Sequence, residues 1–149
     1  MENWKSNLEA YFLEQKKSKK EITKEKEGMK KEIKRFMKKE ALPAFEELQK
    51  EFKKHNRNLE IDSKKDWGAA LVKKNKHKEF VYKVNINRDG KNLLVSKRVY
   101  LPNEKGKLKL DMEGNIGNAG RALFLKDIKE EDIISDFLEN YKNATRIKK

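Results

Sequence analysis

The chain has 149 residues and a formal net charge of +13, with 42% charged residues, 36% hydrophobic residues and no cysteine. This length suits a single compact domain, and the low hydrophobic fraction suggests that part of the chain is exposed helix. The lack of cysteine excludes disulfides and thiolate zinc sites.

The start of the chain and its apolar runs bear on its location. Residues 1–5 are polar and lead into no apolar stretch, so we expect no signal peptide. No run approaches the roughly 18 apolar residues that a membrane-spanning helix needs. We therefore expect a soluble, cytoplasmic protein.

The positive charge points to nucleic acid, but its make-up favours a non-specific mode of binding. There are 32 lysines and six arginines. A lysine bias also arises from an AT-rich genome, and bidentate recognition of bases or phosphates favours arginine. Residues 67–110 hold 12 basic and 3 acidic residues, so most of the excess charge lies in this segment.

The first fifteen residues are predicted to form an amphipathic helix. Residues at positions i, i+4, i+7 and i+8 give it an aromatic-rich stripe. The stripe consists of Trp4, Leu8, Tyr11 and Phe12. It either folds back onto the protein's own core or docks on a partner or a second copy of the chain. A membrane-surface role ranks lower, because Glu2, Glu9 and Glu14 balance much of the helix charge.

A lysine-rich run follows this helix. Residues 16–20 are predicted to be a solvated joint, so we divide the chain into 1–20, an amphipathic helix with a basic joint, and 21–149, a single α+β domain. The helical period resumes over residues 21–55. Pro43 either kinks this helix or lies in the first turn of a second one.

After residue 58 the period of the hydrophobic pattern becomes two, which is typical of strands. The predicted strands are residues 59–61, 67–73, 79–87, 93–101 and 107–112. Asp89-Gly90 favours a tight hairpin, and residues 103–106 form another turn. Short turns between successive strands predict an antiparallel meander.

The C-terminal part begins with a glycine-rich loop over residues 114–121, and residues 123–125 resemble a strand. Asp127-x-x-Glu130 is typical of the start of a helix. We therefore predict an α+β fold: a long N-terminal helical segment, an antiparallel meander of four to five strands and a C-terminal helix.

The chain offers little catalytic chemistry. Its two histidines, His55 and His77, lie in polar surroundings and have no metal-binding spacing, so we expect neither a metal nor a cofactor. The glycine loop fits neither nucleotide-binding fingerprint and is interpreted as a connector, with Gly120-Arg121 as a weak anion contact.

A nuclease-like arrangement of two acidic residues and a lysine does not fit the strands. Asp62 or Asp66 would be the first acidic residue and Glu79 the second, with a lysine two residues further on. That position is Val81, and Lys83 lies too far along the strand to share a metal. We therefore predict a non-catalytic protein.

The best candidate site is a basic sheet face. If the apolar residues of the clearest strand point to the core, the intervening side chains point outward. The predicted nucleic-acid-binding residues are Lys73, Lys83, Arg98, Tyr100, Lys107 and Lys109. Lysines with an interleaved aromatic ring are typical of surfaces that bind single strands. An ordinary solvated face with edge-guarding lysines is the competing interpretation.

Lys97 and Arg98 are adjacent and so point to opposite faces, which predicts that one of them lies near an edge or at a bulge.

Two functions follow from these patterns. The first is a nucleic-acid-binding accessory protein that contacts backbone phosphates. The second is a protein-interaction module, as a homodimer or as a subunit of a larger complex, that uses the aromatic stripe of the first helix.

Overall fold

A computed structural model describes residues 3–117 and 123–147. The chain divides into two compact units, Met1–Glu32 and Ile33–Lys149. The described part of the first unit is helical, and the second unit holds the sheet and the remaining helices. The domain division proposed at residue 20 stays a prediction.

A π-helical turn separates the two N-terminal helices. These elements are α1 (Asn3–Phe36), η1 (Met37–Ala41) and α2 (Leu42–Lys54). Pro43 lies in the first turn of α2. A proline ring clashes with the carbonyl four residues back, and the wider turn accommodates it: the Leu42 N–H donates to the Met37 carbonyl, five residues back.

α1 runs without a break through residues 16–20. The joint predicted at residues 16–20 therefore does not interrupt the helix. Lysine is a good helix former, and nothing in this run stops a helix as proline or a glycine pair would.

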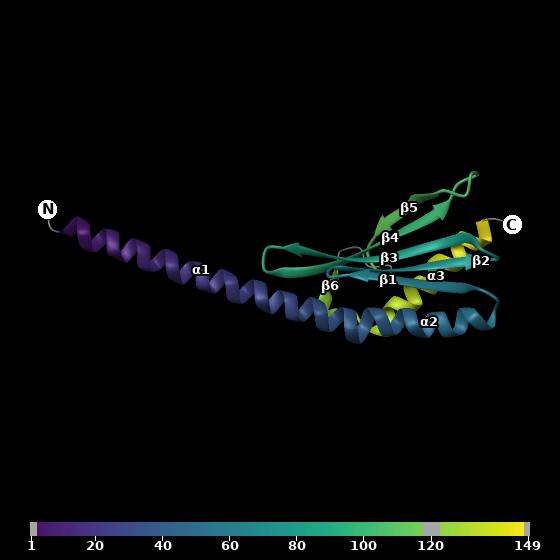
Figure 1. The fold of residues 1–149 in the computed structure, drawn as a ribbon, viewed down its shortest axis with the longest axis horizontal. Coiled ribbons are helices and arrows are strands. Elements are labelled where there is room, and N and C mark those ends of the chain that lie inside the picture. The colour runs from purple at the N-terminus through teal and green to yellow at the C-terminus, as the bar shows by residue number, and fades with distance from the viewer. Residues whose placement is uncertain (1–2, 118–122, 148–149) are drawn as a thin grey trace. The chain divides into compact units, whose positions relative to one another are not determined.

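The sheet is a five-stranded antiparallel meander, which confirms the predicted fold class (Figure 1). Its strands are β1 (Asn58–Lys64), β2 (Trp67–Lys74), β3 (His77–Asp89), β4 (Asn92–Pro102) and β5 (Leu108–Gly114). They are paired in chain order, and the two-residue strand β6 (Leu123–Phe124) pairs with β4. The predicted Asp-Gly hairpin joins β3 to β4, where Gly90 takes a φ of +61°.

Two helices cover one face of this sheet, α2 and the C-terminal helix α3 (Glu130–Ile147) (Figure 1). The predicted inward residues of β3, Phe80, Tyr82, Val84 and Ile86, are all buried. Phe137 of α3 packs edge-to-face on the rings of Phe80 and Tyr82, at 5.3 Å from each. We call this the inner face, and the opposite side the outer face.

A buried ion pair lies within the inner face. Lys97 of β4 donates to Asp136 of α3 at 2.7 Å, and their side chains are 5% and 2% exposed. The Tyr82 hydroxyl donates to the same carboxylate at 2.6 Å, and the Gly117 N–H does so at 2.9 Å. Burial, and next the charge of Asp136, raises the pKa of Tyr82 well above its usual value.

The position of Lys97 corrects the sequence expectation for the Lys97–Arg98 pair. Lys97 lies between Val84 of β3 and Gly114 of β5, so it is neither on an edge strand nor at the bulge of β4. Its charge is accommodated by a carboxylate from another element, which the strand pattern alone does not reveal.

α3 begins later than its predicted cap. A short 3-10 turn, η2 (Leu125–Asp127), precedes it, and the helix starts at Glu130. The Asp132 carboxylate accepts the Lys129 N–H at 2.9 Å, and Glu40 of η1 accepts the Glu130 N–H at 2.6 Å. Carboxylates satisfy the free N–H groups at a helix start, so a residue distant in sequence supplies part of this cap.

Removing the Lys97 charge is expected to destabilise the fold strongly. In Lys97→Met the Asp136 carboxylate stays buried without its cation, which costs about 3–5 kcal/mol of the free energy of unfolding. The matched control is Arg98→Met, which breaks an exposed pair with Glu113 and should cost at most about 1 kcal/mol. Urea unfolding measures the free energy of unfolding of both variants. Equal losses of stability would contradict the assignment of Lys97 and Asp136 as a buried ion pair.

Candidate functional site

The predicted basic face is only partly assembled on the outer face of the sheet. Lys83 and Arg98 pair across β3 and β4, and Tyr100 lies two residues further along β4 on the same side. Lys109 does not join them, because it pairs with Leu101, whereas Leu110 pairs with Tyr100. The register shift between Val99 and Tyr100 causes this change of face, and the sequence pattern does not reveal such a bulge.

Several predicted contact residues already have partners. Arg98 donates to Glu113 at 3.0 Å, and Lys73 donates to Glu60 at 3.0 Å. The Lys83 ammonium lies over the Trp67 ring, 4.4 Å from its centroid. Lys107 and Lys109 are exposed.

The outer face also holds an apolar hollow of about 650 Å³. Its lining includes Trp67, Leu71, Val81, Tyr100 and Leu108. The centre of this face is therefore apolar, with charged groups around it.

The aromatic stripe of α1 is solvent-exposed. Trp4, Leu8, Tyr11 and Phe12 have exposed fractions of 46–59%. The Tyr11 and Phe12 rings make an edge contact at 5.7 Å, and Gln15 donates to the Tyr11 hydroxyl at 2.9 Å. Leu13, which was not part of the predicted stripe, is 59% exposed.

Several cations surround a hollow of about 910 Å³ at the end of α2, which we call the α2 hollow. Its lining residues are Gln49, Lys50, Lys53, Asn56, Arg57, Asn58, Leu59, Glu60, Lys73, Asn75 and Lys76. Five of these are cations, and they come from α2, from the segment after it, and from β2 with its following turn.

Two tight turns bring these segments together. After α2 the Asn56 N–H donates to the Lys53 carbonyl and the Arg57 N–H to the Phe52 carbonyl, at 3.3 and 3.0 Å. This hydrogen-bond pattern ends a helix with a left-handed residue, here Asn56 with a φ of +59°. The chain thereby turns back into β1, which pairs with β2 along its length.

The second turn connects β2 to β3. Asn75 and Lys76 both have positive φ, +51° and +72°, which is typical of a two-residue hairpin turn. Asparagine tolerates this conformation, whereas lysine adopts it only at a conformational cost. The turn thus places an exposed lysine beside the hollow.

The cations of the α2 hollow are only partly neutralised. Lys73 pairs with Glu60 at 3.0 Å, and Lys50 pairs with Glu47 at 3.6 Å on the exposed surface. Lys53 and Lys76 make no ion pair with any residue in the described part of the chain.

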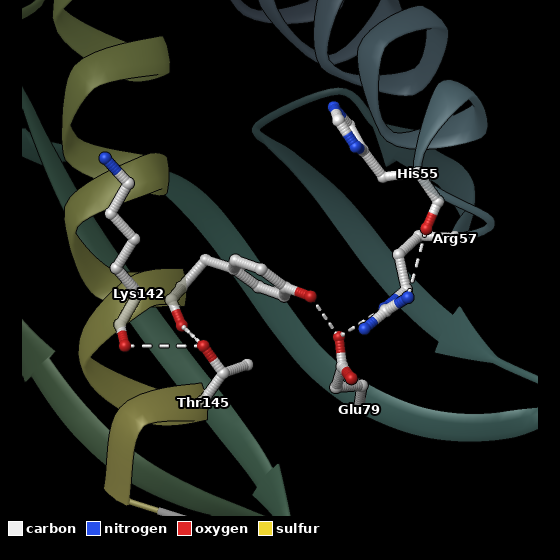
Figure 2. A network of polar contacts seen from close by, with 6 residues as sticks. His55, Arg57, Glu79, Lys142 and Thr145 are labelled. Atoms are coloured by element: carbon white, nitrogen blue, oxygen red, sulfur yellow. Dashed lines mark hydrogen bonds and ion pairs between the residues drawn. The ribbon is translucent and has the colours of Figure 1, made fainter.

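Arg57 lines the hollow and is held in a network of polar contacts (Figure 2). Its Nε donates to Glu79 at 3.4 Å, and its terminal nitrogen donates to the His55 carbonyl at 3.0 Å. The Tyr141 hydroxyl of α3 donates to the same oxygen of Glu79. Burial, reinforced by Glu79, raises the pKa of Tyr141 to about 12.

Of the residues around this hollow, only Lys73 is among the predicted nucleic-acid contacts. Lys50 and Lys53 are ordinary exposed lysines of a helix, and Lys76 is a turn residue. They become neighbours through strand pairing and the turn after α2. The Asn-Lys dipeptide between two alternating strands was the one available signal for the second turn.

The remaining candidates have other surroundings. Glu79, considered above as a metal-binding acid, contacts Arg57 and Tyr141. Gly117 of the glycine loop donates to Asp136, and residues 118–121 of that loop lie outside the described residues. Within residues 3–117 and 123–147, no cluster of three or more histidine and carboxylate groups is placed to hold a metal.

Comparison of the chain with models of protein families, with curated proteins and with solved structures gave no match. No helix in the described part is both long enough and apolar enough to cross a membrane.

The raised pKa of Tyr141 predicts a loss of stability at high pH. The folded state favours the neutral phenol, so this contribution is complete below about pH 10 and is lost as the pH rises toward about 12. We expect the free energy of unfolding to fall more steeply in wild type than in Tyr141→Phe across this window. Urea unfolding at a series of pH values measures the two slopes, which should coincide below about pH 9. Parallel curves throughout would show that Tyr141 is not the group responsible.

Proposed function

We propose that this protein is a non-catalytic binding protein that contacts the phosphate backbone of a nucleic acid through the α2 hollow. The observation that carries the proposal is the convergence of five cations, from three segments of the chain, on one concave surface. Phosphate contacts of this kind supply most of the affinity in sequence-independent binding.

Local structure offsets part of the charge of the hollow and leaves Lys76 without an ion pair in the described part of the chain. α2 ends there, and a helix C-terminus carries about half a negative charge. Lys53 and Lys54 lie in the last turn of α2 and offset it. Arg57, Lys73 and Lys76 come from other segments, and of these Lys73 and Arg57 have carboxylate partners. Like charges held close together repel, and a bound polyanion relieves this repulsion.

Amide side chains complete the lining. Asn56, Asn58 and Asn75 surround the same hollow as the cations. An amide both donates and accepts hydrogen bonds, so it suits phosphate, sugar and base groups alike. With lysine dominating the cations, we infer binding that is insensitive to sequence.

Charge reversal at the hollow should weaken nucleic-acid binding more than the same reversal elsewhere. We expect Lys53→Glu/Lys76→Glu to lower the affinity for a labelled mixed-sequence strand at least roughly tenfold, and to reduce the salt slope by about 1.5. Fluorescence anisotropy from low salt to about 150 mM measures both quantities.

The matched control is Lys107→Glu/Lys109→Glu. It makes the same change in net charge at two exposed lysines of the originally predicted face. It should keep most of the wild-type affinity. If both double variants lose affinity equally, the binding reflects overall charge. If only the control loses affinity, Lys107 and Lys109 belong to the site.

The aromatic stripe of α1 supports a second function, self-association with another copy of the chain. Four large apolar side chains exposed along one helix, Trp4, Leu8, Tyr11 and Phe12, are more than scattered surface residues. Parallel or antiparallel pairing of two such stripes would bury them, as in other helix-to-helix interfaces.

Charge placed in the stripe should prevent this association. We expect wild type to form a dimer in analytical ultracentrifugation and Leu8→Glu/Phe12→Glu to be monomeric at the same concentration, because a charge in an apolar interface is costly. Glu9→Gln/Glu14→Gln, off the stripe, is the control and should remain dimeric. A monomeric wild type would rule out this second function.

A further inference from the structure

A second hollow adjoins the α2 hollow at Arg57. It has a volume of about 530 Å³, and we call it the α3 hollow. Its lining residues are Arg57, Lys74, Glu79, Tyr141, Lys142, Thr145 and Arg146. Arg57 therefore lines both hollows, and four of the seven residues of the α3 hollow are cations.

The end of β2 supplies one lysine to each hollow. Lys73 lines the α2 hollow and Lys74 lines the α3 hollow. The two hollows meet at Arg57, which lines both of them.

Arg57 is oriented by its neighbours at this junction. A guanidinium has five N–H donors, and two of its contacts here are with Glu79 and the His55 carbonyl (Figure 2). Glu79 is itself fixed by the Tyr141 hydroxyl. The remaining donors of a guanidinium held in this way suit the paired oxygens of a phosphate, and little side-chain entropy is lost on binding.

Tyr141 contributes to this arrangement through its hydroxyl. Its ring packs against Phe52 and Phe80, with centroids 4.9 and 5.5 Å away. The half-buried ring is thus held against two core rings, and the α3 hollow offers mainly charge and hydrogen bonds to a strand.

We propose that a bound nucleic-acid strand crosses from the α2 hollow into the α3 hollow over Arg57, which binds a bridging phosphodiester with a fixed guanidinium. This inference rests on the function proposed above and adds a path for the strand. It follows that affinity should grow with strand length until both hollows are occupied.

The test uses the full chain and labelled single strands of mixed sequence, from about four to about sixteen nucleotides long. For wild type we expect the affinity to rise with length and then level off. In Lys142→Gln/Arg146→Gln, which alters two exposed residues of the α3 hollow, short strands should bind as in wild type and the gain with length should be lost.

A second variant tests the role of Arg57. Arg57→Lys keeps the charge and removes the planar fork, so we expect roughly tenfold weaker binding with an unchanged salt slope. Arg98→Lys is the matched control, because Arg98 is also paired with a glutamate, Glu113 on the outer face, and it should bind as wild type.

The outcomes separate the two proposals. If wild type does not bind, or if Lys53→Glu/Lys76→Glu binds equally well, the proposed function fails and the strand path fails with it. If those results are as expected, but Arg57→Lys binds normally and Lys142→Gln/Arg146→Gln keeps the gain with length, only the strand path is overturned. Circular dichroism and urea midpoints confirm that each variant is folded.

Discussion

Asp136 accepts hydrogen bonds from three separate parts of the chain inside the core: the Lys97 ammonium, the Tyr82 hydroxyl and the Gly117 N–H. Burying a charged pair carries a large desolvation cost, which is offset only when the geometry is good and further hydrogen bonds are made. This cluster therefore admits one arrangement of α3 on the inner face. Phe137, the residue after Asp136, packs on the Phe80 and Tyr82 rings in the same arrangement of α3.

The position of the candidate site depends on the same arrangement. Tyr141 lies little more than one helical turn after Asp136, so the packing of α3 decides where its hydroxyl reaches β3. The hydroxyl fixes Glu79, and Glu79 orients Arg57 at the junction of the two hollows. The packing of α3 in the core thus determines the position of Arg57 at the surface, through the contacts of Tyr141 with Glu79 and of Glu79 with Arg57.

Much of the fold followed from the sequence, because strand β3 alternates cleanly and the Asp89-Gly90 turn has a strong local signal. The buried position of Lys97 could not be predicted from the strand pattern, because a lysine on the buried side of a strand needs a carboxylate partner from a different element. The face of Lys109 depended on a bulge, which a strictly alternating pattern conceals. The α2 hollow could not be foreseen, because its residues are brought together by strand pairing and by left-handed residues at Asn56, Asn75 and Lys76.

The most direct measurement is a nitrogen-15 NMR titration of the full chain with a short single strand of mixed sequence. We expect the largest shifts on the backbone amides of Asn56, Arg57 and Lys76 and on the Arg57 Nε–H, with small shifts at Lys107 and Lys109. Largest shifts on β4 and β5, with the α2 hollow unchanged, would contradict this expectation.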